Sequence, residues 1–266
     1  MMLSAPKPAA VVEDLGRWVG GLMAPVIGFV SSVRRARMFH PDGLVYVARV
    51  EPSEGGGRDL AAVAERLAGP AIVRLSSAWW RGEKEWLDVL GLAVRFVSPH
   101  CVGDSFPNDR DQDLLLATIR FPWTTPFAPI TTRVSTFLWN HFHAVSPFEV
   151  EGLGRVKLRL RSPRIANPEA RPRAEHLARA VAAGSAVYQL EARRLERPLY
   201  RRSWESIARV ILERPIDIDQ AALRFSPFRD GRGIRPVGFV HHLRASTYAA
   251  SQQARPVANG NAGSGA

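Results

Sequence analysis

Two groups of side chains in this sequence are of the types that bind metal ions. The acidic stretch Asp109, Asp111 and Asp113 begins like a calcium-binding loop. Such a loop needs a glycine directly after its third ligand and a glutamate at its end, where this chain has Leu114 and Arg120. We therefore do not expect calcium binding at this stretch.

The second group is His141 and His143. The pattern of residues 130–143 predicts a helix, and side chains two positions apart on a helix point in different directions. Nothing nearby in the sequence completes a set of metal ligands. We expect these two histidines to have a structural role.

Arg244 and Tyr248 are four residues apart in a segment, 235–252, that is predicted to be helical. Side chains at this spacing share one face of a helix, so the guanidinium can reach the phenol oxygen and favour its ionised form. Taken alone, the pair is more simply explained as an exposed surface contact.

Several common catalytic motifs are missing from the sequence. It has no G-x-x-x-x-G-K loop for nucleoside triphosphates, no complete G-x-G-x-x-G dinucleotide motif and no H-E-x-x-H zinc motif. The G-x-S-x-G nucleophile motif does not occur in the part that we expect to fold. These motifs therefore indicate no function for this chain.

The chain is strongly basic, with 36 basic and 25 acidic residues and a formal net charge of +11. Lysine occurs only at positions 7, 84 and 157, so the other 33 basic residues are arginine. Arginine is suited to bidentate hydrogen bonding with carboxylates and phosphates. The arginines are spread along the chain, and no known nucleic-acid-binding motif accompanies them. We therefore expect no specific nucleic-acid partner, whereas binding of an anionic small molecule is compatible with the charge.

Cysteine content and the two ends of the chain bear on its location. The single cysteine, Cys101, excludes an intrachain disulfide, which fits a cytoplasmic protein. Residues 18–33 form an uncharged run that is too short to cross a bilayer. We favour a helix packed on the domain or on a second subunit of a homo-oligomer. The alternative is an interfacial helix that puts 18–37 on a membrane surface and makes the protein peripheral.

Between its ends the sequence indicates mainly β-structure. Seven apolar or alternating segments predict strands, at 44–51, 71–77, 89–97, 113–119, 155–161, 185–193 and 204–213. Helices are predicted at 59–68, 130–143, 171–183 and 235–252. Strands dominate without regular helical crossovers, so we expect an α+β, mainly β fold: a closed antiparallel β-barrel with helices packed outside. We divide the chain into an N-terminal arm (1–36), a barrel domain (37–250) and a disordered, glycine-rich tail (251–266).

Four segments, in this order, resemble the heme-dependent catalase-like superfamily. They read RMFHPDG at 37–43, PAIVRLS at 70–76, DVLGLAVRF at 88–96, and FSP at 225–227 followed by GIRP at 233–236 and RASTY at 244–248. The superfamily's corresponding elements are R-x-x-H-x-x-G, P-x-x-V-R-F-S, D-P-R-G-F-A-V-K-F and F-S-P…G-I-G-P…R-x-x-x-Y. The matches cover most of the chain, which is much shorter than a full catalase and resembles a minimal barrel core.

This resemblance implies one heme b per chain. Tyr248 would be the axial ligand of the heme iron, bound as the phenolate that Arg244 favours. Arg37 and Arg74 would hold the heme propionates, a two-pronged contact for which arginine is suited.

On the other face of the heme, the resemblance makes His40 the catalytic base. A neutral imidazole can accept a proton from one peroxide oxygen and return it to the other. Ser76 would hold the ring nitrogen of His40 and thereby select its tautomer. Asp88 and Arg95, which also lie in the matching segments, are interpreted as structural.

The chain departs from the catalase pattern on the peroxide side. The distal asparagine of catalases aligns with Ala117 or Thr118, and bulky Phe39 stands where a small residue precedes the distal histidine. The Asp-Thr that follows the proximal tyrosine of catalases is replaced by Ala249-Ala250. An amide donor for the peroxide is missing at Ala117, although the hydroxyl of Thr118 offers a partial substitute.

These features together predict a peroxidase that acts on hydrogen peroxide or on organic hydroperoxides such as lipid hydroperoxides. One alternative is a hydroperoxide isomerase resembling allene oxide synthase. The other is a heme-free barrel that serves as a binding or scaffold protein.

Overall fold

The structure, a computed structural model, describes residues 43–78, 87–101, 106–220 and 223–237. Its strands are β1 (Leu44–Pro52), β2 (Gly69–Ser77), β3 (Leu90–Phe96), β4 (Gln112–Ala117), β5 (His141–His143), β6 (Phe148–Val150), β7 (Gly154–Arg161), β8 (Val187–Arg194), β9 (Glu205–Pro215) and β10 (Ile234–Pro236). Its α-helices are α2 (Arg58–Leu67), α3 (Ala128–Thr131) and α4 (Arg173–Ala182), and its 3₁₀ turns are η1 (Pro99–Cys101), η2 (Pro122–Phe127) and η3 (Leu199–Arg201).

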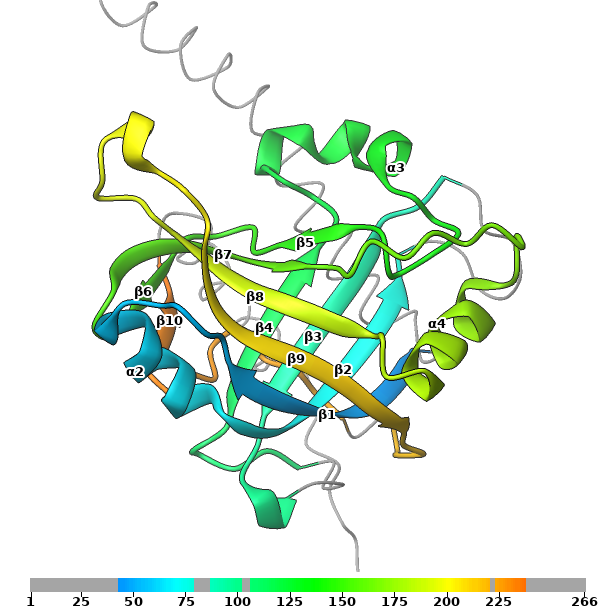
Figure 1. The fold of residues 1–266 in the computed structure, drawn as a ribbon, viewed down its shortest axis with the longest axis horizontal. Coiled ribbons are helices and arrows are strands. Elements are labelled where there is room, and N and C mark those ends of the chain that lie inside the picture. The colour runs from blue at the N-terminus through cyan, green and yellow to red at the C-terminus, as the bar shows by residue number, and fades with distance from the viewer. Residues whose placement is uncertain (1–42, 79–86, 102–105, 221–222, 238–266) are drawn as a thin grey trace, which may run out of the picture.

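Eight of the strands form a closed antiparallel barrel (Figure 1). They neighbour one another in the order β7-β5-β4-β3-β2-β1-β9-β8, and β8 pairs again with β7 to close the ring. The short strands β6 and β10 continue the sheet beyond β7. The predicted closed antiparallel barrel is thus confirmed.

Alternation of apolar and polar side chains explains why these segments are strands. In β7, Val156, Leu158 and Leu160 are buried inside the barrel, while the arginines and the lysine between them point outward. The same alternation places Ala71, Val73 and Leu75 of β2 in the core. All seven predicted strands are present, and no bound differs by more than two residues from the expected one.

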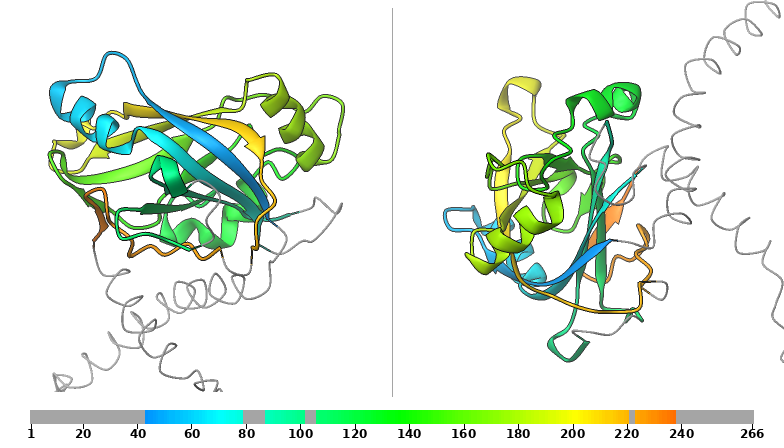
Figure 2. Two further views of the ribbon diagram at one scale, coloured as in Figure 1. Left: turned by 90° about the horizontal axis from the view of Figure 1, so that it is seen from below. Right: turned by 90° about the vertical axis from the view of Figure 1, so that its right-hand side faces the viewer.

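The two longer helices lie outside the strand wall, at opposite ends of the barrel (Figures 1 and 2). In α2 the apolar residues recur at helical spacing, and their buried face joins the interior core; they are Leu60, Val63, Ala64 and Leu67. Leu177, Ala180 and Val181 of α4 do the same at the other end. Each helix therefore covers an end of the barrel that would otherwise expose core side chains to water.

The helix predicted at 130–143 is wrong. The α-helix α3 ends at Thr131, and His141–His143 form strand β5. The side chain of Asn140 stabilises the turn between them, since its Nδ2 donates to the carbonyls of Arg133 (2.8 Å) and Thr136 (2.7 Å). The helix predicted at 235–252 is wrong at its start, where Ile234–Pro236 pair with β6, and from 238 onward it lies outside the described residues.

Candidate functional site

Two of the predicted site residues lie together on β2. They are Arg74, a predicted propionate ligand, and Ser76, which is predicted to position His40. Because alternate β2 side chains fill the barrel core, Arg74 and Ser76 point to the outer face of the barrel. Both are half-buried. Arg37, His40, Arg244 and Tyr248 lie outside the described residues.

Ser76 belongs to a row of small residues that crosses three strands. Ser76 on β2 pairs with Gly91 on β3, and Gly91 pairs in turn with Ala117 on β4. A methyl group added at Gly91 would lie 3.1 Å from Oγ of Ser76, so a larger residue here would press on the Ser76 side chain. Arg74 lies in the next row, opposite Ala93. We call Ser76, Gly91, Ala93 and Ala117 the small-residue platform.

The segment that follows the predicted catalytic histidine is attached beside this platform. The amide of Gly43 donates to Oε1 of Gln220 (2.9 Å), and Nε2 of Gln220 donates to the carbonyl of Gly43 (2.7 Å). Nε of Arg74 donates to the same Oε1 (3.4 Å). A Cβ at position 43 would lie 2.5 Å from Nε of Arg74, so a larger residue there would displace the Arg74 side chain.

A buried ion pair fixes the FSP segment of the resemblance to the outer face of β3 and β4. Nε of Arg95 lies 2.9 Å from Oδ1 of Asp113, and both side chains are fully buried. Oδ2 of Asp113 accepts hydrogen bonds from the amide of Ser226 (2.8 Å) and from Arg229. The guanidinium of Arg95 also lies 4.9 Å from the ring centroid of Phe225. The structural interpretation of Arg95 is confirmed.

Replacing Asp113 with asparagine should lower the free energy of unfolding by about 3–5 kcal/mol, because the charge of Arg95 would stay buried without its carboxylate. The measurement is urea unfolding followed by circular dichroism. Arg209→Gln is the control, since its pair with Glu51 lies on the surface and should contribute less than about 1 kcal/mol. A loss in Asp113→Asn no larger than that in the control would contradict the structural role.

Asp88 is likewise structural, since its buried Oδ1 accepts from the amides of Val89 (2.6 Å) and Ala78 (3.1 Å). The hydroxyl of Thr118 bonds with the amide of Leu90 (3.1 Å) and the hydroxyl of Thr132 (2.8 Å). These bonds tie Thr118 to its neighbouring elements, whereas Ala117 belongs to the small-residue platform.

Strand β5 places a histidine beside the small-residue platform. His143 is the register partner of Ala117, so it continues the platform row onto a fourth strand. His141 and His143 point to the same outer face because they flank buried Phe142, and their ring centroids are 6.3 Å apart. Burial, assisted by the charge of Arg159, lowers the pKa of His143 to about 3, so its ring is neutral at physiological pH. The sequence His-Phe-His alternates, but three residues are too few to identify a strand.

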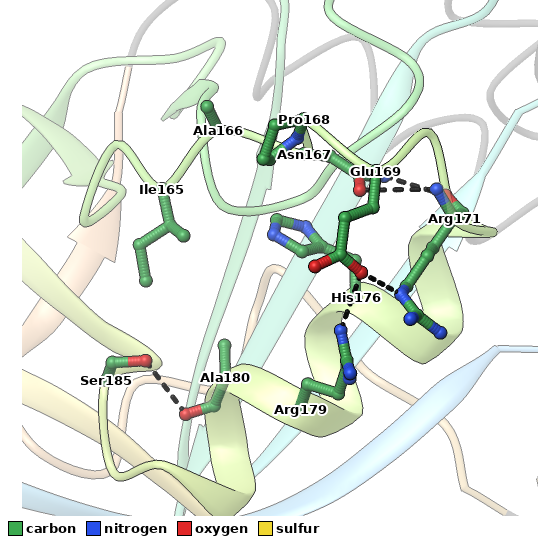
Figure 3. A pocket seen from close by; sticks show the side chains of 10 residues that line it. All are labelled: Ile165, Ala166, Asn167, Pro168, Glu169, Arg171, His176, Arg179, Ala180 and Ser185. Carbon is green, nitrogen blue, oxygen red and sulfur yellow. Dashed lines mark hydrogen bonds and ion pairs between the residues drawn. The ribbon is translucent and has the colours of Figure 1, made fainter.

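A hollow of about 260 Å³ lies between the segment before α4 and the helix itself (Figure 3). Its charged lining residues pair with one another: Glu169 contacts both Arg171 and Arg179, the latter at 2.8 Å. Nδ1 of His176 lies 2.9 Å from Oγ1 of Thr136. The Glu169 carboxylate and the His176 ring are thus already paired with groups of the protein.

Within the ranges that the structure describes, no three histidine, cysteine or carboxylate side chains come together as metal ligands. The helices in those ranges are also too short or too polar to cross a lipid bilayer.

Comparison with known proteins supports the fold. No family model and no curated protein matches the sequence. Among solved structures, the chain is similar to a bacterial catalase, with a TM-score of 0.52 and 16% identity over 82% of this chain. The match covers 57% of the catalase, so this chain spans little more than half its length. The protein is one with a catalase-like barrel; at this identity the likeness shows the fold alone.

Proposed function

We propose that this protein binds one heme b and acts as a peroxidase on hydrogen peroxide or organic hydroperoxides. The observation that carries the proposal is the small-residue platform, with Arg74 beside it, on the outer face of a catalase-like barrel. A flat macrocycle needs a surface without bulky side chains, and Gly91 with its register partners Ser76 and Ala117 supplies a row of small side chains. Two of the resembling segments are attached at its margins, through Gly43 and through Ser226.

The residues of this chain have distinct tasks in the proposal. Tyr248 and Arg244 hold the cofactor from one side, and Arg37 and Arg74 bind its propionates. When bound, heme supplies a redox-active iron at which a peroxide O–O bond can be cleaved. His40 moves the proton between the two peroxide oxygens, and Ser76 positions the ring of His40.

Heme binding is tested by the absorption spectrum of the purified protein after titration with hemin. We expect a Soret band that saturates at one heme per chain and survives desalting. A protein that gains no Soret band would overturn the proposal and favour a heme-free binding or scaffold protein.

The platform itself is tested by Gly91→Val combined with Ser76→Ala. Valine suits a strand, and removing Oγ of Ser76 relieves the local collision, so the barrel should still form. The raised side chain should weaken heme retention about tenfold or more. Arg209→Val on the outer face of β9 is the control, because it adds the same side chain elsewhere. Equal retention in the two proteins would remove the platform from the heme site.

A further inference from the structure

Two loops on one side of the barrel expose large apolar side chains. In η2 and α3, Phe127 is 63% exposed and Ile130 is 70% exposed. In η3, Leu199 is 79% exposed and Tyr200 is 83% exposed. Both loops project from the same side of the barrel, at the top of Figure 1 and of the right-hand view of Figure 2. We call these four residues the apolar tips.

The bases of the two loops are connected by a basic strip on the outer wall of the barrel. Lys157 of β7 and Arg193 of β8 are register partners. Nζ of Lys157 lies 4.5 Å from the ring centroid of Phe121, next to η2, and the guanidinium of Arg193 lies 4.9 Å from that of Trp204, which follows η3. The strip therefore lies between the two loops. We call Arg120, Lys157 and Arg193 the cation floor.

The cation floor carries positive charge that no carboxylate in the described part of the chain pairs with. Nε of Arg193 also has no hydrogen-bond partner among the described residues. Burial and then the charges of Arg193 and Arg120 lower the pKa of Lys157. Like charges are thus held together, and an anion placed above them would relieve their repulsion.

Further arginines stand beside the apolar tips. Arg201 is adjacent to Tyr200, and its guanidinium lies 5.6 Å from the tyrosine ring centroid. Exposed Arg133 follows α3 and stacks on Trp139 at 4.6 Å. Each tip therefore has a cation at its side, which is the arrangement that suits the boundary between lipid headgroups and acyl chains.

We propose that this side of the barrel docks on an anionic phospholipid membrane, with the apolar tips entering the headgroup layer and the cation floor facing lipid phosphates. A nucleic acid would match the charge but offers no layer for aliphatic side chains such as Leu199 and Ile130. An acidic protein would need a separate pocket for each convex tip, whereas a lipid surface accepts both. The proposal is independent of heme binding.

Vesicle sedimentation of the full chain tests this docking. The protein should bind phosphatidylcholine vesicles that contain phosphatidylglycerol, bind pure phosphatidylcholine much more weakly, and be released by salt. Glycerol 3-phosphate at matched ionic strength should not compete, because it lacks a surface for the apolar tips. Full competition by this soluble phosphate, or no binding to the anionic vesicles, would overturn the proposal.

Paired variants identify the surface that binds. Leu199→Ser with Tyr200→Ser, or Phe127→Ser with Ile130→Ser, should weaken vesicle binding about tenfold or more, since each removes apolar side chains from one tip. Lys157→Gln with Arg193→Gln should weaken it about thirtyfold, because each charge near an anionic surface contributes about a fivefold change. All of these side chains lie outside the core, so the variants should fold like the unchanged protein. Thermal unfolding checks that they do.

Two control variants carry matched changes elsewhere. Phe106→Ser removes an apolar side chain that is 79% exposed in the loop before β4, and Arg49→Gln with Arg209→Gln removes two charges from the outer faces of β1 and β9. Both should bind vesicles like the unchanged protein. If the tip variants also bind normally, the membrane contact belongs to another part of the chain and the proposal is wrong. Loss of self-association without vesicle binding would assign the tips to a second copy of the chain instead.

Discussion

Replacing Tyr248 with phenylalanine is expected to abolish stable heme retention. The change keeps the ring and removes only the phenol oxygen, which is the atom that the catalase-like resemblance assigns to the iron. After titration with hemin and desalting, the variant should retain less than about a tenth of the Soret absorbance of the unchanged protein. Circular dichroism should show the same barrel in both proteins.

Two further variants separate ligation from general disturbance. Tyr200→Phe removes the same oxygen from an exposed loop and should leave heme binding unchanged. Arg244→Gln removes the charge that favours the phenolate, so the phenol pKa should rise. As the pH is lowered, the phenolate of the variant should therefore be protonated, and its coordination lost, at a higher pH than in the unchanged protein. A full Soret band in Tyr248→Phe would refute the ligand assignment.

The barrel strands were predictable from sequence because each long strand carries apolar side chains on the face that lines the core. In β7, charged residues alternate with Val156, Leu158 and Leu160, and this pattern fixes both the strand and its inward face. The pairing order and the closure between β7 and β8 were not predictable in the same way. They depend on contacts such as Leu158 with Ala192, which are distant in sequence.

The short strands were missed for a physical reason. Strand β5 has three residues, which is too few to show an alternation, and the neighbouring apolar residues favoured a helix over 130–143. The turn made by Asn140 depends on carbonyls that only the folded chain brings together. Consequently the neighbourhood of His143 and Ala117 was not predictable from the sequence.

The candidate site could be proposed from the sequence only through the residues of the resembling motifs. The resemblance pointed to Arg74 and Ser76, and the structure places both on the outer face of β2. It did not point to the role of Gly91, which appears only when β3 is aligned with β2. The cation floor likewise arises from register, since Lys157 and Arg193 are far apart in the sequence.

Replacing His40 with alanine is expected to slow hydroperoxide consumption by roughly 10²–10⁴-fold in heme-loaded protein, which is the usual contribution of a general acid–base group. Heme content should not change, because Tyr248 remains as ligand. The assay follows hydrogen peroxide disproportionation and fatty-acid hydroperoxide consumption in parallel. Ser76→Ala should cause a smaller loss, because it removes only the group that positions the ring. Equal activity in His40→Ala would exclude the histidine from the mechanism.

The same assay tests the substrate preference, which rests on Ala117 and Phe39. Alanine at position 117 cannot donate a hydrogen bond to the peroxide, so the unchanged protein should evolve oxygen only weakly. Phe39 should make the distal side more apolar and favour a substrate with a hydrocarbon body. Ala117→Asn restores an amide donor on the platform and should raise oxygen evolution from hydrogen peroxide relative to consumption of fatty-acid hydroperoxide. Catalase-level oxygen evolution by the unchanged protein would contradict the preference, and an allene oxide product would identify an isomerase.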